Sequence, residues 1–282
     1  MPRLWLQDGD PLSRIVTRVS DNLDLLKHID DNSIDLIYCD ILYGTGKKFD
    51  DFDDLSSIKE VIEEHYSPRI KEMHRVLKED GSIYLQMDTR INHWLRCIMD
   101  HVFGYKCFRN EICWWYKRWS NTTYGYQKMH DVILFYSKDK GTFNTQYQGY
   151  SKPETIEETV RGIVDGKLVR LKDEDGNYIK REGVNKGVPM HDVWELQHLQ
   201  PTSKERVGYS TQKPKALIER IIQSSSNEGD LVGDFYMGSG TTAVVCKELN
   251  RNFIGCDISK KAVDITLKRL QNIQSGKGIE WL

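Results

Sequence analysis

The chain has 282 residues, of which 39% are hydrophobic and 29% charged, and its formal net charge is −2. This composition is ordinary for a globular protein with a sizeable core. The near-neutral charge does not by itself indicate a nucleic-acid partner, so any basic surface has to be local. No apolar run approaches the ~20 residues that span a bilayer, and the N-terminus lacks the apolar segment of a signal peptide. We therefore expect a cytoplasmic protein with no membrane partner.

The six cysteines show no metal or redox pattern. They stand at positions 39, 97, 107, 113, 246 and 256, with no CxxC pair and no Cys/His cluster of zinc-ligand spacing. Several lie in apolar runs, where free buried thiols are common. We expect reduced, structural cysteines and no metal site.

The first region is typical of an α/β fold. Residues 34–40 (IDLIYCD) form an apolar run of strand length, and loop glycines follow them. A helical stretch over about 56–79 then leads through an acidic turn with glycine into a second apolar strand, SIYLQM, at 82–87. A strand, a helix and a strand in this order predict parallel pairing.

The middle region, about 141–208, has a different pattern. Residues 166–183 alternate polar and apolar side chains around an Asp-Gly turn, which predicts a hairpin. No strong long helix is indicated. We interpret 141–208 as an inserted, β-rich or irregular unit that serves recognition.

The last region returns to the α/β pattern. Apolar residues at 217, 218, 221 and 222 predict one face of a helix within 213–226. A strand, a turn, a helix, a strand and a terminal helix are then predicted at 230–236, 237–240, 241–250, 252–258 and from about 259.

The turn in DFYMGSGTT, 234–242, places glycines between a strand and a helix. Such a turn lets a ligand approach the backbone, and the helix N-terminus favours negative charge. It is not a P-loop, because no lysine follows the last glycine. Asp257 ends the next strand about twenty residues on, where an acid suits ribose hydroxyls. These features together indicate a nucleoside-containing cofactor.

The order of motifs in this chain resembles that of the β-class amino-group DNA methyltransferases. That family places a T-Q-K-P helix directly before a D-P-F-x-G-S-G-T-T turn, with a D-P-P-Y tetrapeptide far upstream and a target-recognition region between. Here TQKP stands at 211–214, the turn at 234–242 and the variant tetrapeptide DILY at 40–43. The segments SKERVGYSTQKP and KMHDVILFYSKD also resemble family segments.

The resemblance implies a Rossmann-like fold that depends on S-adenosylmethionine (AdoMet), with a mostly parallel sheet, helices on both faces and circularly ordered motifs. It implies a catalytic domain in two parts, 1–140 and 209–282, separated by a target-recognition insert at 141–208.

The resemblance also assigns cofactor contacts. The glycine turn would line the methionine end of AdoMet, Asp257 would hold its ribose, and Ser210, Thr211 and Lys213 would reach its carboxylate. A segment around Asp21 often contacts the adenine in this family. The alternatives are a solvated lysine at Lys213 and a structural cap at Asp257. The candidate cofactor-binding residues are Asp21, Asp40, Ser210, Thr211, Lys213, Asp234, Phe235, Gly238, Gly240, Thr241 and Asp257.

The tetrapeptide carries the predicted chemistry. The acceptor in this family is an exocyclic amine on a base, whose lone pair is delocalised into the ring. The Asp40 carboxylate and the Ile41 carbonyl could each accept one N–H, which would free the lone pair for in-line attack on the methyl group. Tyr43 would stack on the flipped base. The alternative for Tyr43 is a strand-end tyrosine that packs over the core.

The tetrapeptide departs from the family because Ile41 and Leu42 replace two prolines, and Phe235 replaces the proline expected after Asp234. Loss of proline loosens the turn but removes no carbonyl acceptor. We therefore expect that restoring both tetrapeptide prolines preserves or raises the rate. Asp at the first position favours adenine N6, and cytosine N4 is the alternative acceptor.

A local basic region is the candidate DNA surface. Residues 105–140 hold seven basic and three acidic residues, a balance of +4 interleaved with aromatics. The alternative is a strand pair with solvated lysines around buried tryptophans, in which Trp114 and Trp115 would point to opposite faces. The candidate DNA-binding residues are Trp115, Lys117, Arg118, Lys128 and Arg206.

We therefore predict an AdoMet-dependent methyltransferase that acts on adenine N6 in double-stranded DNA. The resemblance further implies a homodimer and a possible restriction-enzyme partner. A non-catalytic relative that binds AdoMet or DNA is the alternative from a different functional class.

Overall fold

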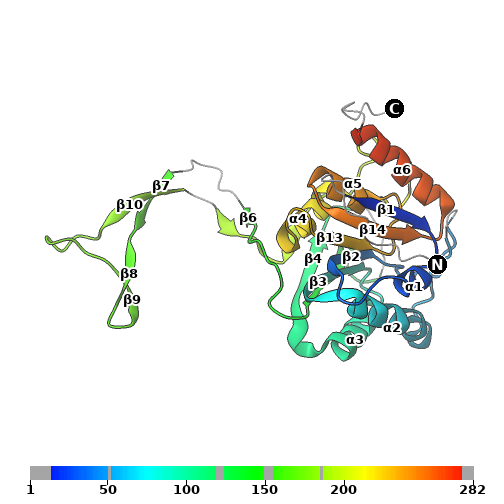
Figure 1. Cartoon of the computed structure of the whole chain (residues 1–282), viewed down its shortest axis with the longest axis horizontal. Coiled ribbons are helices and arrows are strands. Elements are labelled where there is room, and N and C mark those ends of the chain that lie inside the picture. The colour runs from blue at the N-terminus through cyan, green and yellow to red at the C-terminus, as the bar shows by residue number, and fades with distance from the viewer. Residues whose placement is uncertain (1–13, 50–51, 119–123, 149–154, 185–186, 275–282) are drawn as a thin grey trace. The chain divides into compact units, whose positions relative to one another are not determined.

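The computed structural model describes residues 14–49, 52–118, 124–148, 155–184 and 187–274, which form two compact units (Figure 1). The larger unit comprises the described residues up to Asn144 together with those from Asp192 onward. The smaller unit is Thr145–His191.

The larger unit is built on an eight-stranded sheet in the order β1-β14-β13-β2-β3-β5-β4-β12. Pairing is parallel from β1 through β3, antiparallel on both sides of β5, and parallel again between β4 and β12. In that spatial order the strands are β1 (Ile15–Val19), β14 (Asn252–Asp257), β13 (Leu231–Asp234), β2 (Ile34–Asp40), β3 (Leu77–Met87), β5 (His130–Ser137), β4 (Phe108–Trp115) and β12 (Val193–Glu195).

Helices cover both faces of this sheet, and each face has its own apolar cluster. One face packs against α1 (Asn22–Leu26), α2 (Lys59–Val76) and α3 (Asn92–Phe103), and the other against α4 (Lys215–Ser225), α5 (Thr241–Glu248) and α6 (Lys260–Gln274). A short 3₁₀ turn, η1 (Tyr105–Cys107), precedes β4. The predicted fold class, a mostly parallel α/β sheet with helices on both faces, is confirmed.

The local patterns place most of these elements correctly. The apolar run at 34–40 is β2, it pairs in parallel with β3, and α2 lies between them. The apolar positions expected on one face of α4 are all fully buried. The strand expected at 230–236 ends earlier, at Asp234, where the Asp234 carboxylate accepts the Tyr236 N–H at 3.1 Å and closes a turn.

The circular order brings an early strand and a late strand of the chain together at the centre of the sheet. β13 pairs with β2, with Val232 opposite Leu36 and Gly233 opposite Ile37. From β13 the chain proceeds through α5 to β14 on one side, and from β2 it proceeds through α2 to β3 on the other. The carboxyl ends of β13 and β2 therefore flank the point where the strand order reverses, which is where open α/β sheets bind ligands.

The smaller unit consists of two-stranded ribbons, and no helix occurs in its described part. β6 (Tyr147–Gln148) pairs with β11 (Val188–Pro189), β7 (Thr155–Thr159) with β10 (Lys180–Val184), and β8 (Arg161–Val164) with β9 (Lys167–Arg170). This unit lies inside the predicted insert 141–208. Residues after Asp192 instead join the large sheet, because β12 pairs with β4.

The hairpin expected over 166–183 has different strand partners. Its first half, β9, pairs with the preceding β8 around Asp165 and Gly166. Both turn residues have positive φ, +51° and +73°, which is the backbone of a tight hairpin turn. The expected turn at 173–177 does form, because the Asp173 N–H donates to the Asn177 carbonyl at 2.9 Å. It is followed only by an isolated bridge between Lys172 and Tyr178, and the second half of the predicted hairpin, β10, pairs with β7. The turn at Asp165-Gly166 therefore joins β9 to β8, whereas the alternation had predicted that β9 pairs across the later turn at Asp175-Gly176.

None of the helices described in the structure is long and apolar enough to cross a membrane.

Candidate functional site

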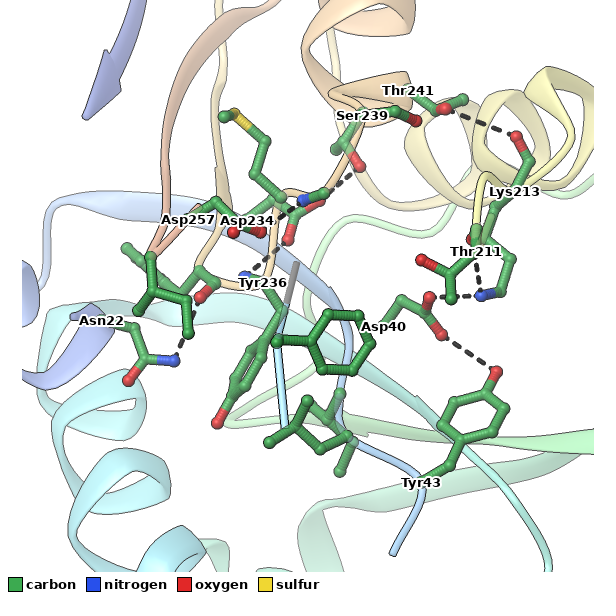
Figure 2. A pocket seen from close by; sticks show the side chains of 18 of the residues that line it. Asn22, Asp40, Tyr43, Thr211, Lys213, Asp234, Tyr236, Ser239, Thr241 and Asp257 are labelled. Atoms are coloured by element: carbon green, nitrogen blue, oxygen red, sulfur yellow. Dashed lines mark hydrogen bonds and ion pairs between the residues drawn. The ribbon is translucent and has the colours of Figure 1, made fainter. Parts of the chain in front are cut away.

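A pocket opens at the carboxyl ends of β13 and β2 (Figure 2). It gathers segments that are far apart in sequence: the tetrapeptide, the stretch before α4, the glycine turn and the end of β14. Of the predicted catalytic and cofactor residues, its lining contains Asp21, Asp40, Ile41, Leu42, Tyr43, Thr211, Lys213, Asp234, Phe235, Gly238, Thr241 and Asp257. The lining does not include Ser210, which is exposed, or Gly240, at the start of α5.

The glycine turn presents backbone to this pocket. Gly240 has φ +72°, and a Cβ there would collide with the Thr266 side chain. Gly238 donates its N–H to Asp257 Oδ2 at 2.8 Å, and Asp257 Oδ1 accepts the Ser259 N–H at 2.8 Å. Asp257 therefore does cap the backbone. A carboxylate offers about four acceptor positions, so this cap still leaves capacity for hydroxyl donors from a ligand.

Asp234 stabilises the glycine turn by accepting two hydrogen bonds. It is 2% exposed, and its Oδ2 accepts the Thr242 hydroxyl at 2.6 Å while Oδ1 accepts the Tyr236 N–H. Burial raises the pKa of Asp234 to about 7. The adjacent Phe235 side chain is buried in the core, and its carbonyl accepts Asn22 Nδ2 at 3.1 Å. Both residues thus fix the shape of the turn.

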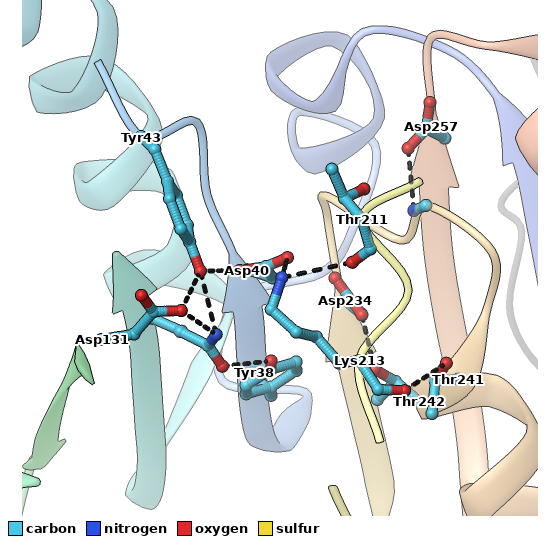
Figure 3. A network of polar contacts seen from close by, with 12 residues as sticks. Tyr38, Asp40, Tyr43, Asp131, Thr211, Lys213, Asp234, Thr241, Thr242 and Asp257 are labelled. Carbon is cyan, nitrogen blue, oxygen red and sulfur yellow. Dashed lines mark hydrogen bonds and ion pairs between the residues drawn. The ribbon is translucent and has the colours of Figure 1, made fainter. Parts of the chain in front are cut away.

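Asp40 ends β2 and forms an ion pair with Lys213 (Figure 3). Lys213 Nζ contacts Asp40 Oδ2 and also donates to the Thr211 carbonyl at 3.2 Å. The Lys213 side chain is only 10% exposed, so the alternative of a solvated lysine does not hold. Burial raises the pKa of Asp40, and the Lys213 ammonium opposes this by favouring the carboxylate.

Tyr43 lines the pocket and its hydroxyl is held in a polar network. The hydroxyl lies 3.0 Å from Asp40 Oδ1 and 2.6 Å from Asp131 Oδ2, and it accepts Gln86 Nε2 at 3.0 Å. Lys213 Nζ lies 5.4 Å from the centroid of the Tyr43 ring. The ring is therefore fixed beside the catalytic candidate Asp40 and is not simply packed over the core.

The two aliphatic residues of the tetrapeptide have distinct environments. Ile41 is 3% exposed and donates its N–H to the Gln86 carbonyl at 3.1 Å. The Leu42 carbonyl accepts the Tyr66 hydroxyl at 2.9 Å, whereas the Ile41 carbonyl accepts no hydrogen bond from any described residue. This leaves the Ile41 carbonyl available as the second acceptor. It also argues against the expectation that proline is harmless at both positions, because proline at 41 would remove a donor that is in use.

The far end of the pocket is formed by α1 and the residue after Asp257. Asp21 caps α1 by accepting the Leu23 N–H at 2.8 Å, and it pairs with Arg69 Nη2 at 2.8 Å. Ile258, directly after Asp257, is 61% exposed and lines the pocket. The apolar Ile258 side chain offers a contact surface for a ring, whereas the Asp21 carboxylate already pairs with Leu23 and Arg69.

Sequence reasoning missed several polar residues near Asp40. Asp131, Gln86 and Tyr116 form hydrogen bonds with one another or with Tyr43, and the His198 ring lies 3.7 Å from that of Tyr116. Part of the signal was present, because Gln86 lies inside an apolar strand run and Asp131 directly precedes another, where a polar side chain needs a specific partner.

Four of the five candidate DNA-binding residues lie on β4 or on the loop that follows it, at this edge of the sheet. Trp114 is fully buried while Trp115, on the opposite face of β4, is half-buried. Lys117, Arg118 and Lys128 are exposed on the loop between β4 and β5, whose other residues include the almost fully exposed Tyr124 and Tyr126. Arg206 is half-buried. The loop leaves and re-enters the sheet at the strand ends beside Asp131.

Comparison with known proteins supports one family. The family model described as DNA methylase matches residues 34–268. The Type II methyltransferase M.HpaI of Haemophilus parainfluenzae is 33% identical over 257 residues, which cover 91% of this chain and 74% of that protein. The DNA adenine methyltransferase YhdJ of Escherichia coli (strain K12) is 31% identical over 252 residues, which cover 89% of this chain and 80% of that protein.

A solved structure agrees with the fold. The crystal structure of an M1.HpyAVI–SAM complex superposes with a TM-score of 0.56 at 22% identity, and the match covers 90% of this chain and 99% of that one. Taken with the family match and the pocket, this confirms the expected type of enzyme. The chain belongs to the amino-group DNA methyltransferase family, and it is an AdoMet-dependent DNA methyltransferase.

Proposed function

We propose that this enzyme transfers the methyl group of AdoMet to the exocyclic N6 of a flipped-out adenine in double-stranded DNA. The observation that carries the proposal is the pair of acceptors at the end of β2. The Asp40 carboxylate and the Ile41 carbonyl are adjacent and line the same pocket as the glycine turn and Asp257.

The residues of the pocket fit AdoMet. Asp257 has acceptor capacity left for ribose hydroxyls, and Ile258 offers an apolar surface for the adenine. An ammonium has three protons, and two on Lys213 are directed to Asp40 and the Thr211 carbonyl, so one remains for the cofactor carboxylate. When bound, AdoMet supplies an electrophilic methyl group on a sulfonium.

The chain's own residues prepare the amine. Asp40 Oδ2 is held by Lys213, which leaves Oδ1 to accept one N–H, and the Ile41 carbonyl accepts the other. Two acceptors on one nitrogen favour tetrahedral geometry and free its lone pair. The Tyr43 ring provides a stacking surface for the flipped base.

Adenine is favoured over cytosine because an aspartate begins the tetrapeptide, where the family pattern puts Ser for cytosine N4. The relative YhdJ, named as a DNA adenine methyltransferase, supports this choice. Cytosine N4 is the second candidate, since its exocyclic amine presents the same two N–H groups.

The contacts to DNA are assigned by position. The exposed cations of the β4–β5 loop lie beside the carboxyl end of the sheet and would contact phosphates, and the ribbons of 145–191 would read the target sequence. The homodimer and the restriction-enzyme partner implied by the resemblance remain predictions, as does the cytoplasmic location expected from the sequence.

The central test is transfer of labelled methyl from AdoMet to genomic DNA. We expect the wild-type enzyme to transfer and Asp40→Ala to lose transfer with its AdoMet affinity largely intact, because Asp40 contacts the acceptor amine. Digestion of the product to nucleosides should give N6-methyladenine. Transfer by the mutant at the wild-type rate, or AdoMet and DNA binding by the wild type without transfer, would refute the proposal.

The same methylated genome identifies the target. Modification-sensitive sequencing should show one short recognition sequence, as expected if the unit 145–191 reads bases. Methylation without sequence preference would contradict that assignment, and N4-methylcytosine in the digest would establish the second candidate.

The acid limb of the pH–rate profile should depend on Lys213. Burial raises the pKa of Asp40, the Lys213 ammonium lowers it, and the nearby Asp131 raises it. Ionised Asp40 is a much stronger acceptor for an N–H than the protonated acid, so the rate should fall as the pH drops through this raised pKa. Lys213→Met removes the cation and should move the limb to higher pH, measured in single turnovers at saturating AdoMet.

A matched control stands two residues away. Lys215 pairs with Glu248 at 2.7 Å, so Lys215→Met removes the same charge without touching Asp40. An unshifted limb in Lys213→Met, or equal shifts in both variants, would show that Lys213 does not govern Asp40.

The tetrapeptide should respond unequally to proline. Ile41→Pro removes the N–H bonded to Gln86 and leaves that carbonyl unpaired, which costs on the order of 1–3 kcal/mol. Leu42→Pro removes an N–H that has no partner among the described residues and keeps the carbonyl that Tyr66 uses. We expect Ile41→Pro to lower both the melting temperature and the rate more than Leu42→Pro does. Equal effects would mean that the Ile41 N–H is unimportant.

The loop cations should set DNA affinity and its salt dependence. Lys117→Ala/Arg118→Ala should weaken DNA binding and reduce the slope of log K against log salt by about 2, since each phosphate contact contributes about 0.9. The control Lys106→Ala/Lys140→Ala removes equal charge at the opposite ends of the same strands. Binding titrations at several salt concentrations check this, and equal slopes in the two double variants would contradict a DNA contact at the loop.

A further inference from the structure

Asp131 is a buried carboxylate that no step above uses. It is the second residue of β5, is 3% exposed, and lies on the other side of β3 from the tetrapeptide strand β2. Its Oδ2 is 2.6 Å from the Tyr43 hydroxyl, and its Oδ1 accepts the Tyr116 hydroxyl at 2.8 Å. A buried acid with two tyrosine donors next to the acceptor site calls for an account beyond core packing.

The orientation of Gln86 follows from Asp131. Gln86 Nε2 lies 3.2 Å from Asp131 Oδ2, and an ionised carboxylate can only accept, so the Gln86 amide presents its NH₂ group to this side. Its Oε1 accepts the Tyr38 hydroxyl at 2.8 Å, which satisfies the other end. The same NH₂ group donates to the Tyr43 oxygen at 3.0 Å.

Tyr43 then has one proton and two carboxylates that could receive it. The distance to Asp131 Oδ2 is 2.6 Å and that to Asp40 Oδ1 is 3.0 Å (Figure 3). The shorter distance is typical of an O–H donor to an ionised carboxylate, whereas 3.0 Å is at the long limit for such a bond. The proton therefore belongs to the Tyr43–Asp131 pair, and Asp40 Oδ1 keeps its lone pairs.

We propose that Asp131 is a positioning residue that binds the Tyr43 proton and thereby keeps Asp40 Oδ1 free to accept the target amine. Without Asp131, the Tyr43 hydroxyl has one carboxylate left within reach, and it donates to Asp40 Oδ1. The hydroxyl then occupies one of the two acceptor positions of Oδ1 and makes that oxygen a weaker acceptor for the substrate N–H. The inference rests on the proposed function, in which Asp40 accepts an N–H of the base.

This role predicts a rescue. Asp131→Ala should lower kcat by about tenfold or more while the KM for AdoMet changes little, because the cofactor contacts lie elsewhere. Adding Tyr43→Phe removes the competing hydroxyl and keeps the stacking ring. The double variant Tyr43→Phe/Asp131→Ala should therefore be several-fold faster than Asp131→Ala alone.

Tyr116 provides the matched control. Its hydroxyl also loses its acceptor in Asp131→Ala, but no hydrogen bond joins it to Asp40 in the described structure. Tyr116→Phe/Asp131→Ala should thus show no recovery of rate. If Asp131 were only structural, removing either orphaned hydroxyl would help equally or not at all.

The experiment uses the full chain, genomic DNA and labelled AdoMet, with the melting temperature and AdoMet affinity of each variant measured in parallel. Asp131→Leu fills the volume that alanine vacates and is paired with Tyr43→Phe in the same way, so a poorly folded alanine variant does not end the test. Rescue by Tyr43→Phe alone supports the proposal. No rescue, or equal rescue by Tyr116→Phe, in a folded variant overturns it while wild-type transfer still upholds the methyltransferase function. Absence of transfer by the wild type overturns both.

Discussion

The parallel pairing of β13 with β2 is the constraint on which the site depends. It places two strands that end in acids, the buried Asp234 and the partly buried Asp40, side by side at the switch point of the sheet. Neighbouring buried carboxylates oppose each other's ionisation, and each is costly unless it has its own donors. Asp234 obtains them locally, from Thr242 and the Tyr236 N–H. Asp40 obtains a cation, Lys213, from a segment more than 170 residues away.

The segment before α4 fixes the position of Lys213. The buried Gln212 side chain holds this loop through two hydrogen bonds. Its Oε1 accepts the Val207 N–H at 2.8 Å, and its Nε2 donates to the Glu205 carbonyl at 2.8 Å. Pro214 then caps α4 in extended conformation, which fixes where the helix begins. Thus the glutamine shapes the loop, the proline starts the helix, and Lys213 between them is directed into the pocket. The three residues are consecutive because each of them fixes the backbone or side chain next to it.

The sequence predicted what local patterns encode. Apolar runs, the glycine turn and Asp257 located the parallel half of the sheet and its ligand edge, because strand period and turn chemistry are properties of neighbouring residues. The Tyr43–Asp131 contact joins residues 88 positions apart, and no local rule selects that pair. The same limit explains why the predicted hairpin partners were wrong. An Asp-Gly pair stands on each side of β9, and local alternation does not show which of the two turns joins β9 to its partner strand. Polar residues inside or directly before apolar strand runs were the one local sign of the hydrogen-bond network around Tyr43.

Lys213 connects the two halves of the proposed reaction electrostatically. Its ammonium already lies between Asp40 and the Thr211 carbonyl, and its remaining proton faces the pocket in which the cofactor carboxylate would sit. In the proposed complex this one cation serves two anions. It keeps Asp40 ionised, because it lowers the pKa of that carboxyl, and it would hold the cofactor carboxylate. The same side chain therefore links the group that accepts the amine to the group that binds the methyl donor.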